Sequence, residues 1–398
     1  MFRKSINIVL AAILMLTIFV VGGVTLAEHW REFGYALTKG YTNYIKEDGQ
    51  PLASVKARVS MLTYTINRTI LGVDEMERFN LRFQLALGKQ IFSVGPNTMV
   101  KLKTGQLYDL LSVSSMSDDV EKMVKLKQNL QDMGIPMLFV YPHSYLYEDN
   151  MLPDGVTDDN IRAADELVTG LRAADIPVID SRDSYKAAGL TIDQAIYRTD
   201  QHWATPNLFA TFQATAQKLN EMGFAIDPSL YASDSFTTNI YAQMHMGQVG
   251  ERLGPSLITP DDFVLMQPTY ETLLHKKIVN GTKTEEFSGS FHDLLNWKLI
   301  DDAKKDGVSN LYSVYGNHDA ENWYVNDKVP TGRILISKDS YGTPFVDFLV
   351  LAAHEVLAVD LRKSARTIED YAREYKPDIV IVAHSQAMLR EANYVFVE

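Results

Sequence analysis

The chain contains no cysteine, which excludes disulfide bonds, thiolate metal sites and a cysteine nucleophile. It also lacks a glycine-rich phosphate loop, a His-x-x-x-His zinc pattern and the glycine fingerprint of dinucleotide-binding folds, so we expect no cofactor and no metal. Basic residues are outnumbered by acidic ones, the net charge is −12, and no dense Lys/Arg cluster occurs. Nucleic acid is therefore not expected as a partner.

The one long apolar run lies at the N-terminus. Arg3 and Lys4 precede residues 6–27, which carry no charge. A helix of about twenty apolar residues crosses a bilayer, and basic residues stay on the cytoplasmic side. We therefore expect residues 1–30 to be a single-pass anchor in the cell membrane, with the rest of the chain outside the cytoplasm. Secretion after cleavage is the alternative, because residues 25–27 (Thr-Leu-Ala) resemble a signal-peptide cleavage site.

Helical and strand patterns alternate in the domain expected over residues 116–398. Helical faces are predicted within residues 123–133, 161–171 and 368–375, and buried strands at 137–141, 178–180, 333–337, 355–360 and 378–383. Such alternation predicts an α/β fold with a mainly parallel sheet covered on both faces. Residues 31–115 are predicted to be a linker and irregular entry segment. Residues 228–330 interrupt the alternation and are predicted to be an irregular insertion.

A serine lies at the bend between one of these strands and a helix. The strand ends near Ser337, and Lys338-Asp-Ser-Tyr-Gly342 leads into an amphipathic segment. The carboxyl ends of parallel strands are where sites of α/β folds occur, and a helix N-terminus favours the negative charge of an attacking serine. Ser340 is therefore a candidate nucleophile; the alternative is that it only caps the helix.

A candidate partner for the serine lies in Tyr197-Arg-Thr-Asp-Gln-His-Trp203. Asp200 and His202 stand two residues apart, just before a predicted helix with Thr205 as its N-cap and Pro206 as its first residue. With Asp200 accepting from one ring nitrogen, the other nitrogen is left basic, as in a Ser-His-Asp arrangement. Metal ligation or simple hydrogen bonding within the loop would be equally compatible with this pair.

Together these motifs resemble the DHHW family of exported bacterial proteins, named for an Asp-His-His-Trp sequence. That family is related to alginate O-acetyltransferases and, more distantly, to SGNH-type esterases, in which Asp and His also precede the serine. The resemblance covers roughly residues 85–398 and includes Tyr315-Gly-Asn-His-Asp319 and Val359-Asp-Leu-Arg362. Gln201 departs from it, because the family name has histidine there; the substitution bears on substrate preference and on polarity around the base.

The resemblance implies a flavodoxin-like, SGNH-hydrolase-like fold of three layers, α/β/α. It also implies that Ser340 is the nucleophile and forms an acetyl ester. His202 would be the general base and then the acid, and Asp200 would orient it.

Further site residues are implied by the same resemblance. The developing oxyanion needs about two donors, and the amides of Ser340, Tyr341 and the Asn317 side chain are the candidates. Asn317 could equally hold only a turn. Arg362 could bind a substrate carboxylate or steady the site, or be an ordinary surface arginine.

The expected function is an exported O-acetyltransferase or acetylesterase that acts on a cell-envelope polysaccharide. The resemblance implies a multispanning membrane O-acyltransferase as the donor partner, since export separates the site from cytosolic acetyl donors. A non-catalytic envelope protein that binds glycan or acts as a scaffold on the same fold is the alternative. Gln201 and the absence of a Gly-x-Ser-x-Gly sequence keep that alternative open.

Overall fold

The computed structural model describes most of the chain. The described residues are 2–38, 73–94, 97–103, 106–112, 115–143, 151–253, 258–280, 283–316, 318–364 and 366–386, together with 62, 65, 69 and 389. The chain divides into two compact units, Met1–Leu87 and Gly88–Glu398.

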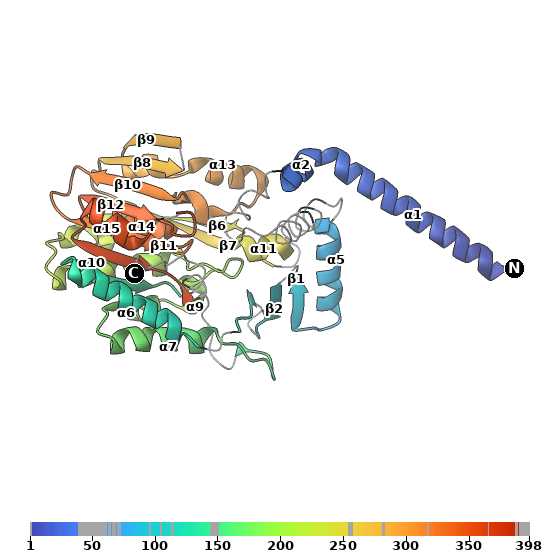
Figure 1. The fold of residues 1–398 in the computed structure, drawn as a ribbon, viewed down its shortest axis with the longest axis horizontal. Helices are drawn as coiled ribbons and strands as arrows, with labels where there is room; N and C mark the ends of the chain where they lie inside the picture. The colour runs from blue at the N-terminus through green and yellow to red at the C-terminus, as the bar shows by residue number, and fades with distance from the viewer. Residues whose placement is uncertain are drawn as a thin grey trace. The chain divides into compact units, whose positions relative to one another are not determined.

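The first unit contains the segment for which the sequence predicts a membrane anchor. The helices whose bounds are described in this unit are α1 (Phe2–Glu28), α2 (Trp30–Thr38) and α5 (Val73–Ala86) (Figure 1). On α1 the side chains are described from Met15 onward, and Leu16 and Phe19 are exposed. Among the described residues, no helix is long and apolar enough to span a bilayer. The anchor remains a prediction.

The second unit is built on an eight-stranded sheet (Figure 1). Its strands run in the order β5 (Val178–Asp180), β4 (Met137–Tyr141), β13 (Ile379–Ala383), β11 (Arg333–Lys338), β12 (Glu355–Val359), β10 (Glu321–Asn326), β8 (Leu274–Asn280) and β9 (Lys283–Gly289). Neighbouring strands from β5 to β12 are parallel. The last three join the sheet antiparallel. The predicted mainly parallel α/β sheet is confirmed.

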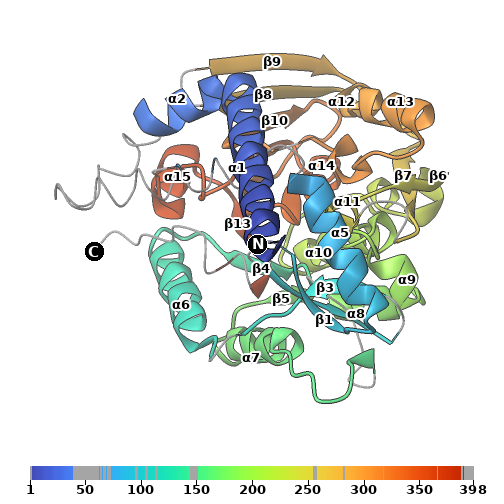
Figure 2. The same cartoon turned by 90° about the vertical axis from the view of Figure 1, so that its right-hand side faces the viewer.

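Helices cover both faces of the parallel strands (Figure 2). Alternate residues of β13 show this, because Ile379 and Ile381 belong to one apolar core and Val380 and Val382 to another. The helices of the second core are α6 (Ser117–Asp132), α7 (Asn160–Ala173) and α15 (Ile368–Tyr375). Those of the first core include α10 (Thr205–Glu221) and α14 (Gly342–Leu349). A strand with both faces buried is apolar throughout, which is why the sequence runs are continuous.

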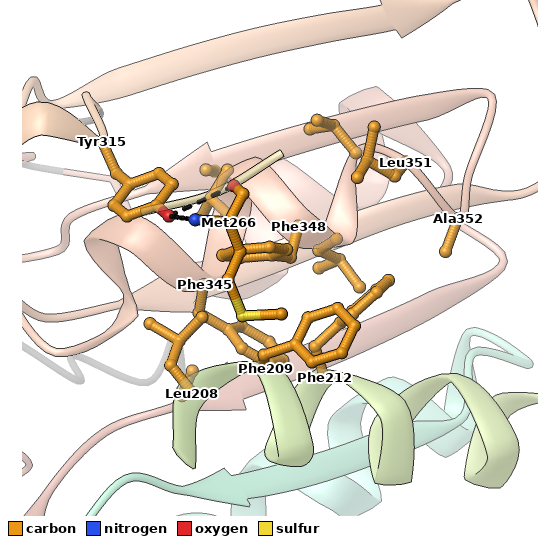
Figure 3. Packing of buried hydrophobic residues seen from close by; sticks show 14 of the residues in the cluster. Leu208, Phe209, Phe212, Met266, Tyr315, Phe345, Phe348, Leu351 and Ala352 are labelled. Atoms are coloured by element: carbon orange, nitrogen blue, oxygen red, sulfur yellow. Dashed lines mark hydrogen bonds between the residues drawn. The ribbon is translucent and has the colours of Figure 1, made fainter. Parts of the chain in front are cut away.

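The first core joins two helices that begin close to the candidate motifs (Figure 3). Phe348 of α14 lies 5.7 Å from Phe209 and 5.8 Å from Phe212 of α10, measured between ring centroids. Tyr315 packs on the same ring at 5.5 Å. Because α10 follows His202 and α14 follows Ser340 directly in the chain, this aromatic packing fixes the two motifs relative to each other.

The prediction of an irregular insertion over residues 228–330 was wrong. The segment supplies β8, β9 and β10 to the main sheet, and its other elements are η2 (Pro228–Leu230), η3 (Ser233–Ser235), β6 (Phe236–His245), α11 (Gln248–Leu253), β7 (Asp261–Pro268), α12 (Phe291–Leu294), α13 (Trp297–Asp306) and η4 (Leu311–Val314). Strands β8 and β9 are the last two of the sheet and carry several charged residues, so they lack the apolar alternation that identifies a strand. The Asn280-Gly281 dipeptide between them was the available hairpin signal.

The segment predicted to be a linker also holds regular structure. Strands β1 (Ile91–Val94), β2 (Asn97–Lys101) and β3 (Leu107–Asp109) form a small antiparallel sheet.

Two short helices, α8 (Ser181–Ala187) and α9 (Ile192–Ala195), lie between β5 and the Asp200–His202 loop. Helix α8 packs against α10, so it supports the helix that follows that loop.

Candidate active site

The structure brings Asp200, His202 and Ser340 together in one hydrogen-bonded series. The Nδ1 atom of His202 lies 2.7 Å from Oδ1 of Asp200, and its Nε2 atom lies 2.9 Å from Oγ of Ser340. Asp200 and His202 are buried, whereas Ser340 is partly exposed. A base held by a carboxylate on one side and in reach of a hydroxyl on the other can take a proton from that hydroxyl.

The loop that carries His202 is fixed at both ends. Trp203 forms an isolated β-bridge with Ile196, and its indole N–H donates to the carbonyl of Tyr341 at 2.9 Å. Helix α10 then begins one residue earlier than predicted, with Ala204 as its N-cap and Thr205 as its first helical residue. The Thr205 hydroxyl faces the buried hydroxyl of Tyr197 at 3.5 Å, so it does not cap the helix.

Ser340 lies in a tight bend two residues beyond β11. Helix α14 starts at Gly342 with Tyr341 as its N-cap, and the Ser340 hydroxyl is directed at His202 instead of capping the helix. A Cβ atom on Gly342 would lie 2.6 Å from the Cβ of Lys338. Glycine is therefore required for the close approach of the helix start to the strand end.

A buried carboxylate holds the inside of this bend. The Oδ1 atom of Asp339 accepts from the amide of Tyr341 at 2.8 Å, and Oδ2 accepts from the amide of Ser385 at 3.0 Å. Asp339 is fully buried. The bend after β11 is thereby tied to the segment that follows β13, and the orientation of Ser340 depends on both strands.

The other predicted site residues have different positions. The Tyr341 amide is occupied by Asp339, so in this structure it does not offer the predicted oxyanion donor. Asn317 lies outside the described residues. Arg362 donates to both carboxylate oxygens of Asp360, at 2.9 and 2.8 Å, and its side chain is one-quarter exposed. Arg362 is therefore paired with the carboxylate that directly follows β12, and its role at the site stays a prediction.

Charge at the site is set by burial and by the histidines. Burial alone would raise the pKa of Asp200, but the charge and hydrogen bond of His202, with a smaller effect of His245, lower it overall. Asp200 is therefore ionised at neutral pH and stabilises positive charge on His202. Burial also raises the pKa of Tyr312 well above its ordinary value, so its hydroxyl stays protonated and acts as a donor.

Two residues of the predicted insertion complete the site and were missed in the sequence. Tyr312 stacks on the His202 ring with centroids 4.1 Å apart, and its hydroxyl donates to the carbonyls of Ser340 and Tyr341, each at 3.0 Å. His245 places Nε2 3.6 Å from Oδ2 of Asp200. Neither residue lies in a recognisable motif, and sequence alone offers no signal for them.

Comparison with known proteins supports the fold. No family model matches the chain, and no curated protein matches it in sequence. Its structure is similar to that of PatB1 from Bacillus cereus with a sulfonyl adduct, at a TM-score of 0.59 and 15% identity, over 75% of this chain and 97% of PatB1. It is also similar to a DHHW family protein from Eubacterium siraeum, at a TM-score of 0.55 and 13% identity, over 76% of this chain and 94% of the other.

These likenesses define the class of fold. The chain has a large, mostly parallel sheet between helical layers, with the candidate site at the carboxyl ends of the strands. Nearly the whole length of the two similar proteins is matched. The DHHW-like fold predicted from the sequence motifs is confirmed.

Proposed function

We propose that the protein transfers an acetyl group through an ester on Ser340. The observation that carries the proposal is the unbroken hydrogen-bonded series from Asp200 through His202 to Ser340, with distances of 2.7 and 2.9 Å. The fold shared with a DHHW family protein supports it. So does the sulfonyl adduct of PatB1, because sulfonyl groups react with activated nucleophiles.

In the first half-reaction, Oγ of Ser340 attacks the carbonyl carbon of an acetyl ester while Nε2 of His202 takes its proton. Asp200 stabilises the resulting imidazolium. The tetrahedral intermediate then expels the donor alcohol, which receives the proton from His202. In the second half-reaction, an acceptor hydroxyl gives its proton to His202 and attacks the acetyl-serine, and Ser340 recovers its proton as the ester leaves.

The oxyanion of each intermediate needs donors close to Ser340. Within the described residues, the amide of Ser340 donates no hydrogen bond, so it can serve this purpose. The N-terminus of α14 adds a favourable dipole. One donor of this kind is worth about 3–4 kcal/mol of barrier.

For the acceptor we propose a cell-envelope polysaccharide, with a multispanning membrane O-acyltransferase as the donor. Both assignments come from the DHHW resemblance of the motifs at Asp200–Trp203 and Lys338–Tyr341. Water instead of a sugar hydroxyl would make the protein an esterase. Transfer from 4-nitrophenyl acetate to chitopentaose or to a uronic-acid oligomer, read by mass spectrometry, separates the two: acetylated sugar indicates a transferase, and free acetate alone an esterase.

We also propose that residues 1–30 attach the protein to the cell membrane. The proposal is supported by the uncharged run at residues 6–27 behind Arg3 and Lys4, and by exposed apolar side chains on the described part of α1. We expect the full-length protein to be released from the membrane fraction by detergent and not by alkaline carbonate. Recovery of the protein without residues 1–27 in the medium would favour secretion.

The catalytic proposal is tested with 4-nitrophenyl acetate. We expect the wild type to release 4-nitrophenol and Ser340→Ala or His202→Ala to reduce the rate by about 10³-fold or more. The control is Ser181→Ala, because the Ser181 hydroxyl also lies 2.6 Å from a histidine, Nδ1 of His143, but in a fully buried position. This control is expected to keep its activity. An inactive wild type would favour the non-catalytic alternative, a glycan-binding or scaffold protein.

A further inference from the structure

The second oxygen of the Asp200 carboxylate faces a histidine that the proposed reaction does not yet use. Nε2 of His245 lies 3.6 Å from Oδ2 of Asp200, and neither atom has a hydrogen-bond partner among the described residues. His245 is fully buried and Asp200 nearly so. Burying a polar atom without a hydrogen bond costs free energy, and an electrostatic attraction between two such atoms reduces that cost.

The tautomer of His245 follows from its other neighbour. The backbone amide of Leu311 donates to Nδ1 of His245 at 3.1 Å, and an amide can only donate. Nδ1 must therefore hold a lone pair, and in the neutral ring the proton lies on Nε2. Burial lowers the pKa of His245 despite the opposing charge of Asp200, so the ring is neutral at ordinary pH. The ring atom that lies 3.6 Å from Oδ2 of Asp200 is therefore the one that carries the N–H.

The backbone around His245 is fixed on both sides. Ser309 forms two backbone hydrogen bonds across the end of β6, from its amide to Met244 at 3.0 Å and from Met246 to its carbonyl at 2.9 Å. The ring of His245 also packs on Tyr197 with centroids 4.3 Å apart. The position of the ring is therefore determined by the segment of residues 228–330 and not by the Asp200 loop alone.

One short helix contacts both histidines. Helix η4 starts at Leu311, whose amide donates to the ring of His245, and its next residue, Tyr312, stacks on His202.

Gly247 lies against the other side of Asp200, because a Cβ there would lie 2.3 Å from Oδ2. The carboxylate thus lies between His202, His245 and the backbone of Gly247.

We propose that His245 is a positioning residue for the acyl transfer proposed above, on which this inference rests. Its Nε2 atom lies 3.6 Å from Oδ2 of Asp200, beyond hydrogen-bond distance, and the dipole of the N–H group favours the carboxylate position in which Oδ1 accepts from His202. The same dipole stabilises the charged carboxylate while His202 carries the proton. The series of interacting groups then has four members: Ser340, His202, Asp200 and His245. The segment of residues 228–330, which contains His245, is therefore part of the site.

Two substitutions separate the functions of the two ring nitrogens. In His245→Asn, the amide oxygen can replace Nδ1 as the acceptor for Leu311, but no donor reaches Asp200. In His245→Gln, the longer amide can place its NH₂ where Nε2 lies. We expect kcat for 4-nitrophenyl acetate to fall about 10- to 100-fold in the Asn variant, with little change in KM. Loss of a group that orients a metal-binding histidine lowers activity by a similar factor. The Gln variant should retain most of the activity.

The opposite order of activities would overturn the proposal. If the Asn variant were active and the Gln variant impaired, His245 would serve only to hold Leu311. Equal activity in both variants would also contradict a donor role. Melting temperatures of the two variants show whether each one folds, and the comparison is made between folded proteins.

A measurement without substrate keeps this inference separate from the proposed function. Long-range ¹H–¹⁵N NMR of the wild type should show His245 as the Nε2–H tautomer and His202 as the Nδ1–H tautomer. If the wild-type spectrum showed His245 as the Nδ1–H tautomer, the inference would be wrong, and no variant would be needed to show it. We expect the His202 signals to shift in His245→Asn and to be restored in His245→Gln. If this pattern held in an inactive wild type, the proposed reaction would fail and the positioning of Asp200 would stand.

Discussion

At the scale of single residues, surroundings distinguish two serine–histidine contacts with similar distances. The hydroxyl of Ser181 lies 2.6 Å from Nδ1 of His143, and that of Ser340 lies 2.9 Å from Nε2 of His202. The first pair is fully buried, and burial lowers the pKa of His143 to about 3. The second pair has a partly exposed hydroxyl and an ionised carboxylate behind the base. Only the second can exchange a proton with a substrate.

The Asp200 side chain packs against the backbone of Gly247, where only glycine leaves enough space. In Gly247→Ala, the new Cβ would lie 2.2 Å from Cβ of Asp200, so the carboxylate or the β6 end must move. We expect a loss of esterase rate together with about 1–3 kcal/mol of unfolding free energy, the usual cost of overpacking. The rate of 4-nitrophenol release and denaturant unfolding, measured on the same preparations, give the two losses.

The matched control is Gly170→Ala. Its Cβ would lie 2.8 Å from a methyl group of Val120, which is a similar crowding between α6 and α7 away from the site. This variant should lose some stability and keep its activity per folded molecule. If Gly247→Ala behaved in the same way, close packing against Asp200 would have no part in activity.

The sequence predicts some site residues and not others for a physical reason. Asp200 and His202 are recognisable because a short bend before a helix places them together, and Ser340 because a strand, turn and helix pattern surrounds it. His245 and Tyr312 contact the same groups only through the tertiary fold. No local spacing encodes such contacts, so a single sequence could not reveal them.

At the scale of secondary-structure elements, the bend after β11 depends on a contact with β13. Asp339 joins them by accepting from the amides of Tyr341 and Ser385. In Asp339→Asn, an NH₂ group would face one of these amide donors and leave it unsatisfied. We expect a loss of about 1–3 kcal/mol in unfolding free energy and a slower reaction of Ser340. Chemical unfolding and the rate of 4-nitrophenol release test this.

The control for this substitution lies at the other end of the same two strands, β11 and β13. Asp378 accepts from the amide of Arg333 at 2.8 Å, but in an exposed position where water can replace the bond. Asp378→Asn should therefore change stability little and leave the rate unaltered. Equal effects of the two substitutions would contradict a specific role of Asp339 in the bend.

Buried and edge strands differ in how well they can be predicted. The five parallel strands are continuous apolar runs, and each was predicted within about one residue of its observed bounds. Strands β8 and β9 were missed because charged side chains such as Lys277 and Glu285 occupy them. Both side chains are exposed, so these two strands at the end of the sheet form without a continuous apolar run.

At the scale of the whole molecule, buried histidines should make stability depend on pH. Burial lowers the pKa of His143 to about 3 and of His384 to about 4 from an ordinary value near 6.5. Below pH about 6.5 the unfolded chain binds protons at these residues that the folded chain does not bind. Stability therefore falls as pH decreases from about 6.5 toward 4, by about 1.4 kcal/mol for each such histidine between pH 7.5 and 5.5.

Asp200 contributes to the pH dependence of stability over a lower range. Its pKa is lowered in the folded state, so its contribution is complete above the ordinary range of an aspartate and is lost as the pH falls through its folded pKa. The fall in unfolding free energy caused by the buried histidines is therefore measured between pH 7.5 and 5.5, above the range in which Asp200 titrates. Denaturant unfolding at several pH values gives this fall. His143→Gln should reduce the slope over that interval, and an unchanged slope would contradict a neutral, buried His143.

The central claim is that His202 activates Ser340 for covalent chemistry, and the most direct test is the site of reaction with a sulfonyl fluoride. Phenylmethanesulfonyl fluoride is added to the full-length protein, and modified peptides are identified by mass spectrometry. We predict a single modified residue, Ser340, in the wild type and in Ser181→Ala, and no modification in His202→Ala. Absence of modification in the folded wild type, or modification of Ser340 that persists without His202, would contradict the account.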